Sequence, residues 1–258
     1  MQRFVPRFSP LYGIAASIAL SILGASTAWA GAPFVTDDAD TPEAGHFEIN
    51  IAAQYLRFQG GSAGTTPSVE VNYGVTDKLQ VTILTPLAMA HIDHVGTNVG
   101  IGDTELSVKY RFVDADDWGW KPSIAFAPLL IVPSGSEQRG LGGGQMQGFL
   151  PIWLTKEINQ WTLFGGGGYN INPGVERKNW WFTGVGVTRE LTPEWTVGVE
   201  IFHTTPTEKD AKDNTAFNVG AIYNISNSHH VMVSVGRNLI NARENNEFSA
   251  YIGYQINL

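Results

Sequence analysis

Residues 69–84 read VEVNYGVTDKLQVTIL, with apolar and polar side chains alternating on both sides of the short polar segment Thr76-Asp77-Lys78. Alternation with a period of two predicts β-strands that have one apolar and one polar face. Two such strands around a three-residue polar connection predict an antiparallel hairpin.

The same alternation continues in both directions, from Gly45 to Leu258, as about twelve stretches of roughly ten residues each. No helical pattern separates these stretches, so neighbouring strands are expected to pair as antiparallel neighbours. An even number of such strands can close into a barrel without a free edge, as a lipid environment requires. Strands of this length match a tilted bilayer crossing. The predicted fold is therefore an all-β transmembrane antiparallel β-barrel of about twelve strands.

The connections between the expected strands alternate between short and long. The short connections are 76–78, 157–160, 190–194 and 226–229, with a longer turn at 113–121 in the same series. The long connections are 58–66, 88–102, 133–144, 172–179, 203–214 and 237–246. Outer-membrane barrels have short periplasmic turns and long outer loops, so we expect both chain termini on the periplasmic side.

The N-terminus has the features of a secretory signal peptide. Arg3 and Arg7 precede an apolar run over 11–23, and Ala28-Trp29-Ala30 forms a small-residue cleavage site. We expect a signal peptide over 1–30, cleaved after Ala30, then a periplasmic strap over 31–44 and a barrel over 45–258. The predicted location is the bacterial outer membrane.

The composition excludes other classes of protein. The chain has no cysteine, which agrees with passage through an oxidising periplasm. It carries 16 basic and 24 acidic residues, the opposite sign to that of a nucleic-acid-binding protein. The expected partners are outer-membrane lipid, small-molecule solutes and the barrel-assembly machinery, which would recognise the C-terminal strand.

Aromatic residues gather near both ends of the expected strands. One set lies beside the short turns and the other near the long loops: Tyr73, Phe112, Trp161, Trp195 and Tyr223 in the first, Tyr55, Tyr169, Trp181, Phe217 and Phe248 in the second. Two aromatic girdles are expected where rings meet the lipid headgroups.

The polar face of each strand is expected to line the lumen. The candidate lumen-lining residues are Glu48, Glu70, Asp103, Glu105, Lys109, Arg111 and Glu200. In the later strands this face is mostly glycine: Gly166, Gly168, Gly184, Gly186, Gly198, Gly220 and Gly236. Glycine in a strand marks a bend or the close approach of another group.

Two interpretations of this lumen stay open. In the first, long charged side chains reach across, pair and fill the interior, with Glu48 and Glu70 pairing with Lys109 and Arg111. In the second, a passage runs along the glycine wall and the charged ladder selects the solutes.

Several long motifs resemble a known family. They include the strap GAPFVTDDADTPEAGHFEIN, the hairpin VEVNYGVTDKLQVTILTPLA, and the segments GIGDTELSVKYRF, RGLGGGQMQGFLPIWLTKE, WTLFGGGGYNINPG, NWWFTGVGVTREL and FNVGAIYNISNSHHVMVSVGRNL. Together they are similar to the outer-membrane transporter family named after the meta-pathway of phenol degradation. The resemblance implies a β-barrel that moves small solutes, aromatic or hydrophobic compounds among them. The chain departs from the usual aromatic C-terminal residue of such barrels, since it ends in Leu258.

Catalytic and metal-binding motifs are weak. Only His203 is placed for a lipid hydrolase, and its neighbours are threonines rather than a serine nucleophile. His91 and His94 could contribute to a metal site only with further ligands from other loops. We therefore predict a channel for small solutes by passive diffusion, with no catalysis, cofactor or resident metal. The alternatives are a closed structural barrel that displays its loops and, last, an outer-membrane lipid-modifying enzyme.

Overall fold

The computed structural model describes residues 31–116 and 119–258, so the predicted signal peptide lies outside the described residues. Fourteen strand segments form one sheet. Their bounds are β1 Phe47–Phe58, β2 Gly61–Thr76, β3 Leu79–Ile92, β4 Gly96–Ile101, β5 Thr104–Val113, β6 Ser123–Phe126, β7 Leu129–Val132, β8 Gln147–Ile158, β9 Trp161–Ile171, β10 Trp180–Thr192, β11 Trp195–Thr204, β12 Asn214–Ser226, β13 His229–Asn238 and β14 Phe248–Asn257. Two short helices, η1 (Glu137–Arg139) and α2 (Ala242–Asn245), lie in connections.

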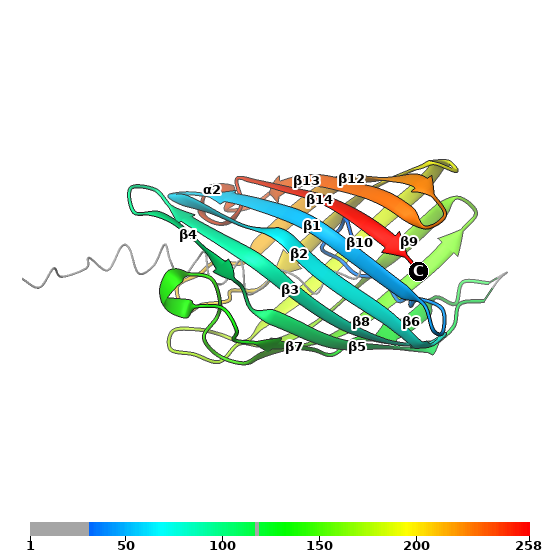
Figure 1. Cartoon of the computed structure of the whole chain (residues 1–258), viewed down its shortest axis with the longest axis horizontal. Helices are drawn as coiled ribbons and strands as arrows, with labels where there is room; N and C mark the ends of the chain where they lie inside the picture. The colour runs from blue at the N-terminus through cyan, green and yellow to red at the C-terminus, as the bar shows by residue number, and fades with distance from the viewer. Residues whose placement is uncertain (1–30, 117–118) are drawn as a thin grey trace, which may run out of the picture.

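The sheet closes into a twelve-strand antiparallel barrel, as the sequence predicted (Figure 1). β4 and β5 pair with successive parts of β3 and together make one wall strand. β6 and β7 likewise make one wall strand between β5 and β8. Pro128 separates β6 from β7, because proline cannot donate a ladder hydrogen bond. The first and last strands, β1 and β14, pair over ten residues, from Glu48↔Asn257 to Arg57↔Phe248.

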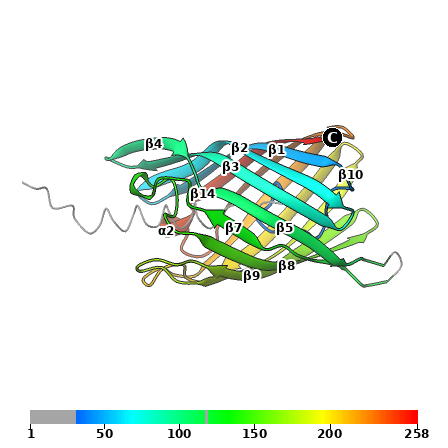
Figure 2. The same ribbon diagram turned by 60° about the horizontal axis from the view of Figure 1, so that its bottom comes forward.

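The two ends of the barrel differ, and Figures 1 and 2 show α2 and β4 at one end and the C-terminus at the other. We call the first the loop end and the second the turn end. Connections at the turn end are short, such as Asp77-Lys78 between β2 and β3 and Asn159-Gln160 between β8 and β9.

Two of the connections expected to be long, 58–66 and 88–102, are mostly strand, and this part of the prediction is wrong. β1 and β2 are joined by residues 59–60 alone, and β3 and β4 by residues 93–95. The alternation fades here because Ser62 and Gly64, opposite Arg57 and Tyr55, stand where the outer face would carry apolar residues. Backbone pairing nonetheless continues to Phe58↔Gly61 and Gly61↔Ile92, so these hairpins extend the barrel wall beyond the apolar belt.

The outer face is apolar and exposed, while the inner face is polar and buried. Val108 on β5 is 44% exposed, whereas the next residue, Lys109, is 2% exposed. Aromatic pairs lie on the outer face at both ends, with Trp195 and Tyr223 at the turn end and Tyr169 and Trp181 at the loop end. Among the described residues, no helix is long and apolar enough to span a bilayer.

The segment before β1 lies inside the barrel. Phe34, Thr36, Asp37 and Ala39 are at most 3% exposed. The segment leaves the lumen at the turn end, where Gly45 donates its backbone N–H to the carbonyl of Gly74 at 2.7 Å. We call residues 31–44 the strap, as in the sequence analysis.

Candidate functional site: a lumen that holds the strap

Glu200 on β11 binds the strap through its carboxylate. The backbone N–H groups of Val35 and Thr36 donate to its two oxygens at 2.7 and 2.8 Å. The side-chain amide of Asn218 on β12 donates to the same carboxylate at 2.6 Å. Three N–H donors thus stabilise a carboxylate that is only 3% exposed. The sequence predicted that Glu200 faces the lumen, and in the structure it binds the strap there.

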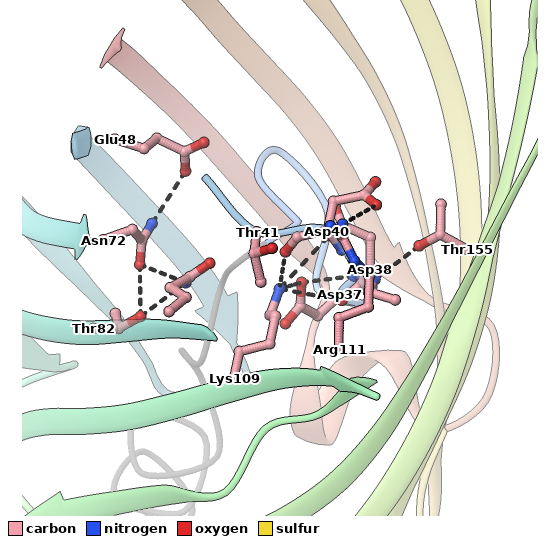
Figure 3. A network of polar contacts seen from close by, with 12 residues as sticks. Asp37, Asp38, Asp40, Thr41, Glu48, Asn72, Thr82, Lys109, Arg111 and Thr155 are labelled. Carbon is pink, nitrogen blue, oxygen red and sulfur yellow. Dashed lines mark hydrogen bonds and ion pairs between the residues drawn. The ribbon is translucent and has the colours of Figure 1, made fainter. Parts of the chain in front are cut away.

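Lys109 on β5 binds the acidic part of the strap (Figure 3). Its Nζ lies 3.0 Å from Asp37 Oδ1 and 3.6 Å from Asp38 Oδ1, and it donates to the backbone carbonyls of Asp38 and Asp40. Lys109 and Asp37 have side-chain exposures of 2% and 3%. Burial raises the pKa of Asp37 to about 7, while attraction by Lys109 opposes this rise. A buried ion pair of this kind keeps its two members together, because either one alone would be a desolvated charge.

Arg111, two residues further along β5, binds at the point where the strap leaves the lumen. Its Nη1 lies 3.6 Å from Asp40 Oδ1, and its Nη2 donates to the backbone carbonyl of Asp77 at 2.6 Å. Its Nε lies 3.4 Å from Asp114 Oδ1. Arg111 therefore joins the strap to two turns at the turn end.

The glycine wall gives room to the strap. A Cβ atom on Gly184 would lie 2.1 Å from Thr36 Oγ1, and one on Gly198 would lie 2.8 Å from Phe34 Cζ. A Cβ atom on Gly220 would lie 3.1 Å from the ring of Pro33. At these three glycines the group that approaches closely is thus the chain's own strap, whereas Gly186 makes room for the ring of Phe164. Residues 33–36 occupy the space of the passage expected along this wall.

Two further hydrogen bonds hold the strap across the lumen. The hydroxyl of Ser234 on β13 donates to the carbonyl of Pro33 at 2.7 Å. The N–H of Ala39 donates to the hydroxyl of Thr155 on β8 at 2.7 Å. With Glu200 and Lys109, these hydrogen bonds give the strap polar contacts with four strands, β5, β8, β11 and β13.

Glu48 and Glu70 do not bind the basic residues, and the predicted pairing with Lys109 and Arg111 is wrong. The side-chain amides of Asn50 and Asn72 each donate to both carboxylates, at 3.0 to 3.1 Å. The strap supplies the carboxylates that Lys109 binds, and Arg111 binds Asp40 of the strap and Asp114 beyond β5. The charged residues of the inner face therefore form two groups. One is a carboxylate–amide network on β1 and β2, and the other is a cluster of charges around the strap.

The two remaining candidates lie apart from these contacts. Glu105 is buried on the inner face of β5, with 5% exposure. Asp103, between β4 and β5, accepts hydrogen bonds from the N–H groups of Gly135 and Gly143 at 2.9 and 2.6 Å. Asp103 thus holds the loop between β7 and β8 at the loop end, away from the strap.

A cavity lies at the loop end of the barrel. Val35 of the strap, Phe182 and Phe202 are part of its lining. The Phe182 and Phe202 rings are stacked, with centroids 5.9 Å apart, and Phe182 packs on the buried cluster of Phe149, Trp153 and Trp180. Aromatic rings share the inner wall here with polar side chains such as Gln54 and Ser234. The glycine-rich and charged patterns in the sequence did not indicate this aromatic part.

The weak motifs remain isolated. His91 contacts Thr97 and Asp93, and His203 contacts the hydroxyl of Thr215 at 2.9 Å. Within the described residues, no group of three or more His, Cys, Asp or Glu side chains is arranged to hold a metal ion.

Sequence reasoning missed the acidic strap residues as partners of Lys109. The sequence held the information in separate places: Asp37, Asp38 and Asp40 in the strap, two bases on the inner face of one strand, and a wall of small residues opposite. Each pattern alone is compatible with a solvated strap, and only the closed barrel brings the three together.

Comparison with solved structures identifies similar barrels. An outer membrane channel from Pseudomonas putida F1 has a TM-score of 0.69 and 16% identity, over 86% of this chain and 98% of that chain. The NanC porin has a TM-score of 0.59 and 12% identity, over 81% of this chain and 100% of that chain. The KdgM porin has a TM-score of 0.55 and 12% identity, over 81% and 98%. These similarities show a shared fold.

No curated protein matches the chain in sequence. The closed barrel and its exposed apolar belt nevertheless place the protein in the bacterial outer membrane. A family match covers residues 24–256, which is nearly the whole chain. The chain thus belongs to the family described as "Putative MetA-pathway of phenol degradation".

Proposed function

We propose that the protein is an outer-membrane channel through which small, largely apolar solutes diffuse passively, and that the strap closes the lumen until it is displaced. The cavity at the loop end carries this proposal. Phe182, Phe202, Leu56 and Val35 of the strap form the apolar part of its lining, and asparagine, threonine and serine side chains form the polar part. Pockets that combine apolar and aromatic side chains with placed polar groups are typical binding sites for small organic molecules.

The strap is suited to a reversible closure. Hydrogen bonds and ion pairs to Glu200, Lys109, Thr155 and Ser234 hold it to the wall, beside the packing of Phe34 on Phe164. Water can replace such bonds when the segment leaves the lumen, at a much lower cost than in a dry interior. The family membership and the fold shared with a channel and two porins support the same function. We propose no catalytic step.

The orientation that we propose places the turn end, both chain termini and the strap in the periplasm. The solute would then enter the cavity from the outside and meet the strap inside the barrel. Short turns on the periplasmic side are the rule in barrels of this kind.

A closed structural barrel is the competing function, and the strap's four-strand attachment is the observation in its favour. One experiment separates the two functions. Conductance in planar bilayers, and the block of that conductance by added benzyl alcohol, are measured for the mature chain and for a variant that lacks residues 32–40. We expect low conductance for the first, and for the second a clear increase that benzyl alcohol reduces. If the shortened barrel folds and still passes no ions, the channel function is excluded.

A further inference from the structure

Four residues form one row across the outer face of the barrel near its loop end. Arg57 on β1 pairs with Phe248 on β14, and Phe217 on β12 pairs with Arg237 on β13. These four strands are neighbours in the order β1, β14, β13, β12, and Figure 1 shows them side by side with α2 at their loop end. The pairing of β13 with β14 ends at Gly236↔Ser249, and the same register continued by one residue brings Arg237 opposite Phe248. The row therefore alternates between arginine and phenylalanine.

The two arginines face the lipid rather than the lumen. On β13, exposed Val235 and exposed Arg237 lie on one face, whereas Asn238 lies on the other face and is buried. On β1, Arg57 follows exposed Tyr55 on the outer face, whereas the neighbouring Phe58 is buried. β1 and β13 both end one residue after the row. The row thus lies where the apolar belt meets the loops, which is the depth of lipid headgroups.

The charges of the two arginines are only partly balanced by the protein. Arg57 Nη2 lies 3.4 Å from Asp93 Oδ2, and both side chains are more than a third exposed. Such an exposed ion pair contributes little stability and leaves most of the five N–H donors of Arg57 available. Arg237 makes no ion pair or side-chain hydrogen bond with any residue that the structure describes. A charge beside hydrocarbon is costly, so an unpaired arginine here indicates a negatively charged partner from the membrane.

We propose that Arg57 and Arg237 form a binding site for a phosphate group of lipopolysaccharide, the phosphorylated glycolipid of the outer leaflet. This inference goes beyond the channel function and uses only the proposed orientation, which places the loop end in that leaflet. A guanidinium group binds a phosphate through two parallel N–H donors. The two arginines lie two strands apart, which is about 10 Å between their Cα atoms. Their long side chains can therefore meet on one phosphate in front of Phe248, while the acyl chains pack on the apolar belt below.

The test measures binding of lipid A, the phosphorylated anchor of this glycolipid, to the full mature chain in detergent by native mass spectrometry. The probes are lipid A with both phosphate groups and the same lipid after their removal. We expect the phosphorylated form to bind about ten-fold tighter, and Arg57→Gln combined with Arg237→Gln to abolish this difference. Arg237→Lys should keep only part of it, because an ammonium group lacks the two parallel donors.

The matched control is Arg189→Gln. Arg189 lies at the turn end, where its guanidinium group is 4.9 Å from the centre of the Trp161 ring. The control makes the same chemical change outside the row and should leave lipid A binding unchanged. Heat-modifiable migration in electrophoresis verifies that each variant folds, and Arg237→Gln alone, with an expected loss of about five-fold, replaces the double variant if that does not fold.

Three results would overturn the site. The first is equal binding of phosphorylated lipid A by the double variant and the wild-type chain, and the second is an equal loss in Arg189→Gln. The third is phosphatidylglycerol binding as tightly as lipid A with the same loss on substitution, which would assign the row to glycerophospholipid instead. A failure of the channel function is distinct, because conductance should be the same in the double variant and the wild-type chain. A reversed orientation is recognised separately, by labelling of a tag at Asn227 on intact cells.

Discussion

At the scale of single residues, we expect Lys109 to have the strongest effect on whether the strap stays in the lumen. Its ammonium group is buried and contacts Asp37 and Asp38, which belong to a segment that can leave. Removing one member of a buried ion pair costs about 3–5 kcal/mol, because the other charge stays desolvated. Here Asp37 avoids that cost if the strap moves into water. We therefore expect the loss of the Lys109 ammonium group to weaken strap docking more than it lowers the stability of the barrel.

The first prediction is therefore that Lys109→Met releases the strap. The strap contains no lysine or arginine but has three aspartates, so an aspartate-directed endoproteinase reports its release. We expect faster cleavage and higher conductance, with a folded and heat-modifiable barrel. Asp37→Asn combined with Lys109→Met should restore part of the protection, since no buried charge is then left unpaired at that position. Unfolding of the barrel without strap cleavage would instead show that the ion pair supports the wall.

At the scale of one strand, β5 alternates between the lipid face and the lumen from Glu105 to Arg111. Val108 is 44% exposed and apolar, and Ser107 and Lys109 on either side face inward. This alternation was fully visible in the sequence, because each residue of a strand points opposite to the next.

The second prediction uses this alternation. Val108→Arg should destabilise the barrel by about 2–4 kcal/mol, because it places a charge against hydrocarbon near the middle of the strand. Ser107→Arg should be tolerated far better, since its side chain enters the lumen. Urea titrations in lipid vesicles measure both changes. An equal loss of stability would show that the facing of β5 is wrong.

The third prediction concerns β10, where Gly184 makes room for the strap. Gly184→Ala adds a methyl group that would lie only 2.1 Å from Thr36 Oγ1. This overlap should weaken the docking of the strap by about 1–3 kcal/mol. The expected result is faster strap cleavage with an intact barrel. Val185→Ala, the same new side chain on the lipid face one residue away, should leave the cleavage rate unchanged.

A second substitution tests the physical cause. Thr36→Ala removes the oxygen and leaves its Cβ 3.1 Å from the new methyl group, so the double variant should regain part of the protection. If Thr36→Ala does not restore protection in the Gly184→Ala variant, the clash between the new methyl group and Thr36 Oγ1 is not what displaces the strap.

At the scale of the whole molecule, the fourth prediction concerns orientation. A tag inserted at Val175, 90% exposed in the β9–β10 connection, should be labelled on intact cells. A tag at Asn227, in the β12–β13 turn, should be labelled only after the outer membrane is opened. Gly142 is a less suitable position for the outer tag, because it packs on Asp103. Labelling of Asn227 on unbroken cells would reverse the proposed orientation. N-terminal sequencing of the mature protein verifies cleavage after Ala30.

The sequence by itself determined the barrel. The period of two, the number of strands and the aromatic residues at both ends are local patterns, because strand geometry assigns each residue to a face without reference to distant parts of the chain. The same rule placed Glu70, Glu105, Lys109 and Glu200 on the inner face. It failed at 58–66 and 88–102, where the strands leave the apolar belt and alternation is no longer required.

Only the tertiary structure decided what occupies the lumen. The strap meets Lys109 and Glu200 across 72 and 164 residues of sequence, so no local pattern connects them. The choice between the strap and Glu70 as partner of Lys109 depends on which carboxylate the closed barrel brings within reach. The loop-end cavity arises in the same way, because the strands that line it are distant in sequence and converge only when the sheet closes on itself.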